Sequence, residues 1–238
     1  MIIGRILKRL YHSIRYRISL RYYKSDSCRG RVIQAYLENE PIAKLQLGCG
    51  PNRLPGWLNA DIIIEECKKG AIYLDVGEHF PLPDESIDYV YSEHMIEHLN
   101  YAQAVNMLRE CHRVLKPNGV IRISTPDLRF LLDLYQNPEK PENKSFIKWS
   151  AEGGAGGEIR PVSPVYVINK FHTTWGHKII YDYDTLASLL KQNGFDHICQ
   201  CELSQSTHEA LTDVERHHLV FSVDFYKLQT MILEANKI

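Results

Sequence analysis

The sequence has no apolar run long enough to span a bilayer as a helix, and its N-terminus lacks the uninterrupted apolar core of a secretion signal. Its six cysteines include no Cys-x-x-Cys pair. Free thiols in a reducing compartment are the interpretation that fits this pattern best. We therefore predict a cytoplasmic protein with unpaired cysteines.

Internal repeats and low-complexity tracts are also missing from the 238 residues. Hydrophobic residues make up 44% of the chain and charged residues 24%, values that exclude a disordered, collagen-like or coiled-coil protein. The length suits one α/β domain with a sizeable core and a modest elaboration, but is short for two independent domains.

Acidic residues are nearly absent from residues 1–31, which carry a net charge of +8, whereas the remainder carries −9. Apolar residues recur there at three- and four-residue steps with basic residues between them, which predicts a cationic amphipathic helix. Its apolar stripe is Ile3, Leu7, Leu10, Ile14 and Ile18. Such a helix can lie on an anionic membrane surface, here the inner membrane, or pack on the domain. Nucleic acid binding and organelle targeting are weaker alternatives.

The most informative motif is Gly48-Cys49-Gly50, which ends the apolar run 44–47. A strand ending in Gly-x-Gly lets the backbone approach a bound nucleotide closely, so it marks a cofactor crevice at the strand's carboxyl edge. The third glycine of Gly-x-Gly-x-x-Gly is missing, because Arg53 stands there. This absence disfavours the pyrophosphate cradle of a dinucleotide dehydrogenase.

Later blocks follow in a defined order: Asp61 and Asp75 each end a strand-like run, and then come FPLPDESIDYVYSEHMIEHL and RVLKPNGVIRISTPD. The series resembles class I S-adenosylmethionine-dependent methyltransferases of the small-molecule, methyltransferase type 11-like branch. The resemblance implies S-adenosylmethionine as the cofactor. It also implies an α/β fold, a Rossmann-like three-layer sandwich whose mostly parallel seven-stranded sheet has an antiparallel closing strand.

The resemblance divides the chain into four segments: a basic arm (1–40), a cofactor-binding core (41–130), an acceptor-side insertion or lid (131–180), and the rest of the same α/β domain (181–238). We expect strands over 57–61, 71–75, 87–92 and 120–124, a helix over 181–193, and final strands near 197–203 and 218–226. Ten residues separate Gly50 from Asp61, and Pro51, Pro55 and Gly56 favour a loop in place of the first crossover helix.

Asp61 is the candidate for binding the ribose, because a carboxylate at the end of the second strand can accept hydrogen bonds from both hydroxyls. The alternative is an acid in a surface turn. The resemblance implies that Asp75 and the backbone of Val76 recognise adenine. The expected cofactor-binding residues are Leu47, Gly48, Cys49, Gly50, Asp61, Asp75, Val76 and Ser92.

Residues 94–98 form His-x-x-Glu-His, which on a helix brings two imidazoles to one face, as in inverted zinc proteases. The motif directly follows an expected strand, however, and no later helix offers an obvious acidic ligand. The resemblance instead implies the lip of the crevice, where His94 or His98 can act as a general base. We predict no metal, and we add His172 as a third catalytic candidate; helix capping and packing remain alternative roles.

Residues 131–180 are longer than a simple connection and contain Gly153–Gly157 as a hinge candidate. The stretch 170–177 then interleaves aromatic rings with hydroxyl, imidazole and lysine groups, which suits a polar acceptor such as a sugar. A loop folded on the domain, with Trp175 in the core, is the alternative.

The segment Ser92-Glu93-His94-Met95 lacks the Asn/Asp-Pro-Pro-aromatic pattern of base-methylating enzymes.

These patterns predict an S-adenosylmethionine-dependent methyltransferase that O-methylates a saccharide, a glycolipid precursor or another small polar acceptor, in polysaccharide biosynthesis. A catalytically silent cofactor-binding scaffold is the alternative, and a zinc hydrolase is a third.

Overall fold

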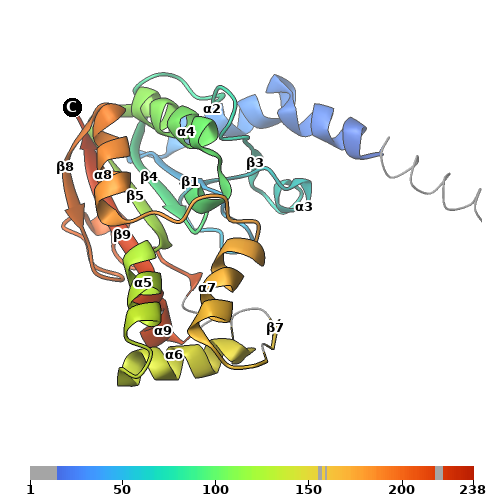
Figure 1. Cartoon of the computed structure of the whole chain (residues 1–238). Helices are drawn as coiled ribbons and strands as arrows, with labels where there is room; N and C mark the ends of the chain where they lie inside the picture. Colours follow the sequence, from blue (N-terminus) through green and yellow to red (C-terminus); the bar gives the residue numbers. More distant parts are fainter. Residues whose placement is uncertain (1–14, 155–156, 159, 218–221) are drawn as a thin grey trace, which may run out of the picture.

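The computed structural model describes residues 15–154, 157–158, 160–217 and 222–238. Its centre is a seven-stranded sheet in the order β3-β2-β1-β4-β5-β9-β8 (Figure 1). The parallel strands are β1 (Lys44–Leu47), β2 (Leu58–Asp61), β3 (Ile72–Tyr73), β4 (Ile87–Glu93) and β5 (Leu115–Pro126). Strand β9 (Thr230–Lys237) is antiparallel to both neighbours, β5 and β8 (Phe195–Gln200). The predicted Rossmann-like α/β fold with an antiparallel closing strand is confirmed.

The main core lies under three helices, α2 (Arg31–Asn39), α4 (Tyr101–Val114) and α8 (Tyr183–Gln192). Their buried residues pack with apolar strand residues of β1, β4, β5 and β9 in one continuous cluster. Helix α4 begins with a capping box, in which Asn100 and Gln103 each accept a hydrogen bond from the other's backbone amide. This capping box sets the start of α4 directly after the turn that carries the His-x-x-Glu-His motif.

The other face of the sheet is covered by residues 201–217, which include the short helix η3 (Glu209–Leu211). Leu211 and Val214 of this segment pack against Tyr91 and Val120 of the sheet. We call residues 201–217 the covering loop. A loop also makes the β1–β2 connection, as the sequence predicts, and only the one-turn helix α3 (Ile64–Cys67) separates β2 from β3.

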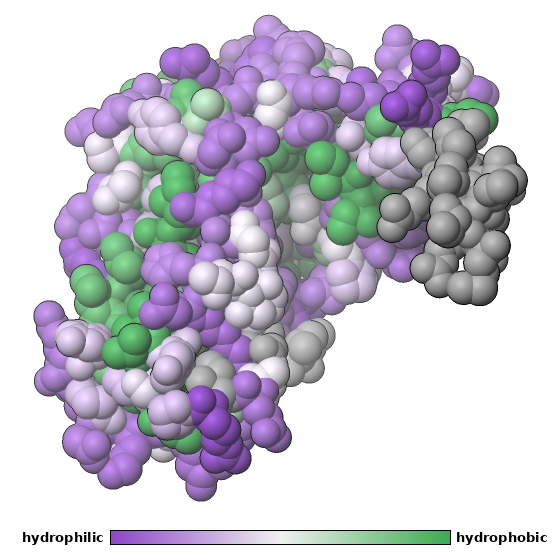
Figure 2. All heavy atoms as spheres, turned by 45° about the vertical axis from the view of Figure 1, so that its right-hand side comes forward, coloured by the Kyte–Doolittle hydropathy of each residue, from purple (hydrophilic) through white to green (hydrophobic). Residues whose placement is uncertain are grey.

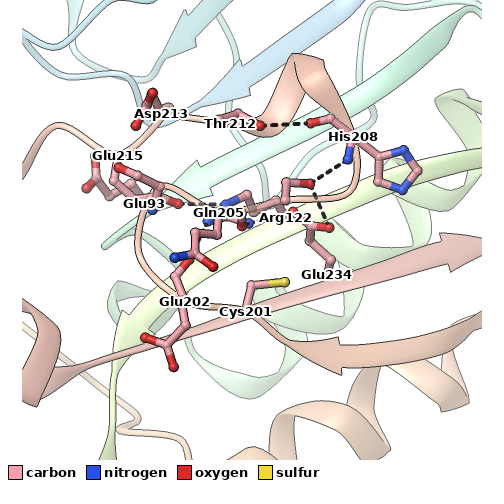
Figure 3. Close-up of polar contacts among 12 residues, drawn as sticks. Glu93, Arg122, Cys201, Glu202, Gln205, His208, Thr212, Asp213, Glu215 and Glu234 are labelled. Carbon is pink, nitrogen blue, oxygen red and sulfur yellow. Dashed lines mark hydrogen bonds and ion pairs between the residues drawn. The ribbon is translucent and has the colours of Figure 1, made fainter.

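A fully buried arginine, Arg122 on β5, fixes the covering loop (Figure 3). Its Nε lies 2.6 Å from Oε1 of Glu215, and its guanidinium also lies 2.5 Å from Oε1 of Glu234 on β9. It donates to the backbone carbonyls of Gln205 and Glu202 as well. Burial alone would lower the pKa of Arg122, but the two carboxylates raise it, so the charge is retained. The loop is thereby held on the sheet by ionic contacts within the protein interior.

The predicted final strand is wrong. Residues 223–229 form helix α9 (Val223–Gln229), the strand follows as β9, and residues 218–221 lie outside the described residues. Strand β9 is buried on both faces, so its apolar residues form the run Met231–Leu233 without polar alternation. Glu234 interrupts that run and is accommodated because Arg122 compensates its charge.

Four helices and a two-stranded hairpin gather at the end of the sheet where β5 finishes and β9 starts (Figure 1). They are α5 (Leu128–Gln136), α6 (Pro141–Ala151), α7 (Pro164–Thr173), α9, and the hairpin of β6 (Glu152–Gly153) and β7 (Gly157–Glu158). We call these elements the cap. They enclose a separate core in which Phe146 packs against Phe130, Phe171 and Phe225. The expected acceptor-side insertion is thus a packed helical unit.

Two residues of the stretch 170–177 have structural contacts in the cap. Lys170 is buried, and its Nζ donates to the carbonyls of Ser150 and Gly157 at 2.9 and 2.7 Å, which fastens the hairpin to α7. Trp175 is partly buried and packs on the cap core. Within the predicted hinge 153–157, the structure describes Gly153, Gly154 and Gly157. The Gly157 carbonyl accepts a hydrogen bond from Lys170.

The described part of the basic arm is a helix over residues 15–24, followed by the π-helix η1 (Asp26–Gly30). Leu20 and Tyr23 pack on Ile64, Cys67 and Tyr73 beside β3. Neither belongs to the predicted apolar stripe, and Ile18, the one described residue of that stripe, is exposed. The same helix exposes Tyr16, Ile18 and Tyr22. Ile3, Leu7, Leu10 and Ile14 lie outside the described residues. Within the described ranges, no helix has the length and apolar character needed to cross a membrane.

Candidate active site

The glycine turn after β1 leaves an open space at the carboxyl edge of the sheet. Gly48 and Gly50 have φ values of +64° and +50°, a left-handed conformation that favours glycine. A Cβ atom on Gly48 would lie 2.6 Å from Cγ of Met95, whereas one on Gly50 would meet no described atom within 4 Å. Gly48 is thus required by packing, and the space at Gly50 is free for a ligand.

Asp61 lies directly beside this turn. Its side chain is buried, Oδ2 accepts from the Gly50 amide at 2.8 Å, and Oδ1 accepts from the Ile63 amide at 2.8 Å. Asp61 is therefore not an acid in a surface turn. Each carboxylate oxygen accepts one of these bonds and has capacity for another, so two ligand hydroxyls can still be bound.

Asp75 and Val76 follow β3 at the same edge. Asp75 Oδ1 accepts from the Gly77 amide at 2.9 Å, and Asn106 on α4 donates to the Val76 carbonyl at 2.9 Å. The parallel registers Leu47–Ala60, Asp61–Tyr73 and Leu47–Ser92 align the ends of β1, β2, β3 and β4. The structure thus brings the candidates from these four strands to one edge.

Two other candidates of this group are fully enclosed. The Ser92 hydroxyl is buried and has no hydrogen-bond partner among the described residues. Burial raises the pKa of the Cys49 thiol to about 12, so it stays protonated and is a poor nucleophile.

Ile62 and Ile63, next to Asp61, are half exposed. Figure 2 shows a face of the molecule that is hollowed in its middle, with hydrophobic residues on the walls.

The His-x-x-Glu-His motif forms a tight turn at the end of β4 and not one continuous helix. His94 has a φ of +46°, and only residues 96–98 are helical, as the 3₁₀ turn η2 (Ile96–His98). The two histidines consequently have different neighbours. The His94 ring lies 4.7 Å from the ring of His217, whereas the His98 ring lies 4.7 Å from the ring of His177.

Glu97 is the buried centre of this turn. Its Oε1 lies 3.2 Å from Nδ1 of His94, and its Oε2 accepts from the Thr125 hydroxyl at 3.1 Å. Burial alone would raise the pKa of Glu97, but the contact with His94 lowers it, so the carboxylate stays ionised. The Glu97 carbonyl accepts from the Lys178 amide at 2.7 Å, which ties η2 to the segment after the cap helix α7.

Glu93 links the end of β4 to the covering loop and to the cap. It accepts from Tyr226 Oη at 2.8 Å and from the amides of Arg216 and His217 at 3.0 Å. Burial would raise the pKa of Glu93, but His217 and these amides lower it to about 2. His217 is thereby positioned beside His94, whose Nε2 lies 3.2 Å from the Thr230 hydroxyl.

A cavity of about 240 Å³ lies where these groups meet. Its lining combines four imidazoles, two aromatic rings, a proline and an amide: His94, His98, His177, His217, Phe171, Trp175, Pro126 and Gln229. Burial lowers the pKa of His177, which favours its neutral form. The cavity borders the cofactor crevice through Met95. This residue contacts Gly48 of the glycine turn and lies in the chain between His94 and η2.

Sequence reasoning found His94 and His98 but missed His177, His217 and Glu93. His177 was noted within a polar and aromatic stretch, yet no local pattern pairs it with His98, and His217 lies 123 residues from His94 in the chain. His172 is exposed on α7 and does not line the cavity. Only the fold brings the distant histidines together.

The chain is similar in sequence to known methyltransferases. Residues 45–123 match a family model described as a methyltransferase domain. A probable S-adenosylmethionine-dependent methyltransferase of Mycobacterium tuberculosis is 31% identical over 138 residues, which cover 58% of this chain and 36% of that protein. One of Mycolicibacterium smegmatis is 52% identical over 48 residues, or 20% of this chain and 18% of that protein. The matched segments thus span about a third of the length of the first of these relatives and less than a fifth of the second.

Among solved structures, the complex of the Haloferax volcanii Trm112 methyltransferase activator with a methyltransferase is similar in fold. The TM-score is 0.50 at 13% sequence identity, with 85% of this chain and 86% of that chain covered. At this identity the likeness concerns the fold alone.

Proposed function

We propose that this chain, which carries a class I S-adenosylmethionine-dependent methyltransferase domain, transfers a methyl group to a hydroxyl of a small polar acceptor. The observation that carries the proposal is that a glycine-lined crevice and a cavity with four histidines lie side by side at the carboxyl edge of the same sheet. Open α/β sheets bind their ligands at this edge.

The residues around the crevice fit S-adenosylmethionine, the cofactor of this domain family. The open space at Gly50 admits the nucleoside beside the buried carboxylate of Asp61, which is suited to the ribose. Asp75 and Val76 at the end of β3 are suited to adenine, and residues 47–49 border the same space. When bound, the cofactor would supply an electrophilic methyl group on a positively charged sulfur. The sulfur–methyl bond would break as the methyl joins the acceptor oxygen, S-adenosylhomocysteine would leave, and the hydroxyl proton would pass to a base on the protein.

His94 is the base that the geometry favours. Its Nδ1 faces the ionised carboxylate of Glu97 at 3.2 Å, an arrangement that orients an imidazole and stabilises its protonated form. Its Nε2 lies 3.2 Å from the hydroxyl of Thr230, and the His94 ring lines the cavity. His98 lines the same cavity and forms no ion pair with a carboxylate among the described residues, so we assign it to the acceptor side.

The cavity lining favours a saccharide unit or a similar polyol as the acceptor. Phe171 and Trp175 offer ring faces on which a sugar can stack, and His98, His217 and Gln229 offer hydrogen-bonding groups at the rim. The small volume favours one sugar ring over an extended chain. A glycolipid precursor, and with it a role in polysaccharide biosynthesis, is consistent with these groups.

The basic arm supports contact with the inner membrane surface as part of this proposal. Its described helix exposes Arg17, Arg21, Tyr16, Ile18 and Tyr22, while Leu20 and Tyr23 attach it to the domain. Basic and aromatic side chains on one exposed helix suit an anionic membrane interface. An acceptor with a lipid anchor would then be held near the cavity.

The experiment combines binding and turnover. Calorimetry and thermal shift with S-adenosylhomocysteine measure cofactor binding, since a ligand raises the unfolding temperature by mass action. Transfer of labelled methyl from the cofactor is then measured with monosaccharides, nucleotide sugars and polyprenyl-linked sugars. Binding together with transfer to a hydroxyl supports the proposal. Binding without transfer to any acceptor would favour the cofactor-binding scaffold, and no binding would overturn both.

A further inference from the structure

Three metal-ligating side chains meet at the wall of the cavity. Glu97 and His98 come from η2, and His177 comes from the segment that follows α7. One ligand atom from each of the three lies within 4.8 Å of the other two. The chain segments that carry them are joined directly, because the Glu97 carbonyl accepts from the amides of Lys178 and Ile179.

Two atoms of this group are buried without a hydrogen bond. Nδ1 of His177 has no hydrogen-bond partner among the described residues, and Oε1 of Glu97 has only the ion-pair contact with Nδ1 of His94 at 3.2 Å, which does not meet hydrogen-bond geometry. Buried polar atoms left without a hydrogen bond destabilise the folded state, so such atoms call for an explanation. The second oxygen of Glu97 accepts a hydrogen bond from Thr125, which fixes the carboxylate so that Oε1, beside His94, can also bind a cation.

We propose that Glu97, His98 and His177 bind one divalent transition-metal ion at the wall of the cavity. Two imidazole nitrogens and one carboxylate oxygen are a ligand set suited to Zn²⁺ or Fe²⁺. Mg²⁺ and Ca²⁺ are poor candidates, because they prefer oxygen ligands. Three protein ligands leave a coordination position open toward the cavity, as in catalytic rather than structural sites.

The surroundings provide the outer shell that such sites need. His94 contacts Oε1 of Glu97 at 3.2 Å, and Thr125 holds Oε2. Ligands at bond lengths of about 2.0–2.1 Å in a tetrahedron lie roughly 3.3–3.5 Å apart, so closure from 4.8 Å needs only modest side-chain rotation. The expectation of no metal rested on the position of the motif directly after a strand and on the lack of an acidic third ligand from a later helix. In this proposal the third ligand is instead an imidazole, His177, from the segment beyond α7.

The use of the ion rests on the proposed function. An acceptor hydroxyl bound at the open position would have its pKa lowered, and its proton would pass to His94 as the oxygen gains the methyl group. His98 would then bind the metal and act on the acceptor only through it. Methyl transfer and metal binding are separately measurable, so the two proposals can fail independently.

The test uses the full chain, stripped with a chelator and dialysed. Zn²⁺, and Fe²⁺ under anaerobic conditions, are titrated by calorimetry, and bound metal is counted by elemental analysis. We expect one equivalent per chain. Substitutions H98Q, H177Q and E97Q should each weaken Zn²⁺ binding by more than about 100-fold, because even outer-shell changes cost about 10- to 100-fold. The exposed His172 is the matched control, and H172N should bind Zn²⁺ as the wild type does.

Absorption of the Co²⁺-loaded protein reports the ligand set even if a variant is less stable, and far-ultraviolet circular dichroism checks that each variant is folded. A wild type that binds no Zn²⁺ or Fe²⁺, or folded variants that bind as tightly as the wild type, would overturn the metal site. Methyl transfer by metal-free protein at the full rate would refute the catalytic use while leaving the proposed function intact. If the protein binds one metal ion but transfers no methyl group, the metal site stands and the proposed function is rejected.

Discussion

Nε of Arg122 lies 2.6 Å from Oε1 of Glu215, and both side chains are fully buried between β5 and the covering loop. This pair determines more than stability, because the loop it holds carries the backbone amides of Arg216 and His217 to Glu93. One wall of the histidine cavity therefore depends on an ion pair of the neighbouring strand β5.

Replacement of Arg122 by Leu should reduce the free energy of unfolding by about 3–5 kcal/mol, because it leaves the Glu215 and Glu234 carboxylates buried without a counter-charge. Urea denaturation measures the loss. The matched control is Arg129→Leu, which removes an ion pair with Asp184 whose side chains are 58% and 73% exposed. That change should cost below about 1 kcal/mol. Equal losses in the two variants would contradict the role given to Arg122.

Replacement of Asp61 by Ala should abolish the thermal shift produced by S-adenosylhomocysteine. The variant removes the carboxylate that faces the space at Gly50 and also frees the Gly50 amide, so both the ribose contacts and the turn are affected. Isothermal calorimetry gives the affinity directly. Asp184→Asn, an exposed carboxylate on α8, serves as the control and should keep the shift. A retained shift in Asp61→Ala would refute the ribose assignment.

Replacement of His94 by Gln should lower the rate constant of methyl transfer by about 10²- to 10⁴-fold, the range for loss of a general base. The affinity for S-adenosylhomocysteine should stay close to that of the wild type, because His94 contacts Glu97, Thr230 and His217 rather than the glycine turn. Single-turnover assays with labelled cofactor separate the two effects. A fall in cofactor affinity without a fall in rate would show that His94 only supports the crevice.

Local sequence patterns predicted the cofactor side of the proposed site but not its acceptor side. The glycine turn, Asp61 and Asp75 are each marked by a residue type at a strand end, so the cofactor side could be predicted from neighbouring residues. The acceptor side depends on contacts between distant segments, such as His98 with His177 and His94 with His217, which carry no local pattern. The last strand was misplaced for a related reason: residues 218–226 are rich in apolar and aromatic residues, yet the buried strand is the run after them.

The stability of the protein should fall between about pH 4.5 and pH 2 partly through Glu93. Its pKa is lowered in the folded protein from 4.5 to about 2, so its contribution is present above pH 4.5 and is lost as the pH falls through 2. The shift corresponds to about 3 kcal/mol. Glu93→Gln should therefore be less stable than the wild type at pH 7, and the difference should shrink toward pH 2. Denaturant titrations across this range measure it, and a constant difference would contradict the assignment.

Reversal of the charge at two arginines of the arm should weaken binding to anionic vesicles. Arg17 and Arg21 are exposed on the helix over residues 15–24, and each basic residue near anionic lipid contributes about 1 kcal/mol. The variant Arg17→Glu/Arg21→Glu should therefore bind phosphatidylglycerol vesicles at least about 30-fold more weakly at low salt, as measured by cosedimentation. Lys144→Glu/Lys191→Glu makes the same change in net charge on α6 and α8 and should have a smaller effect. If both variants bind alike, the attraction depends on net charge alone and the arm is not a membrane-binding element.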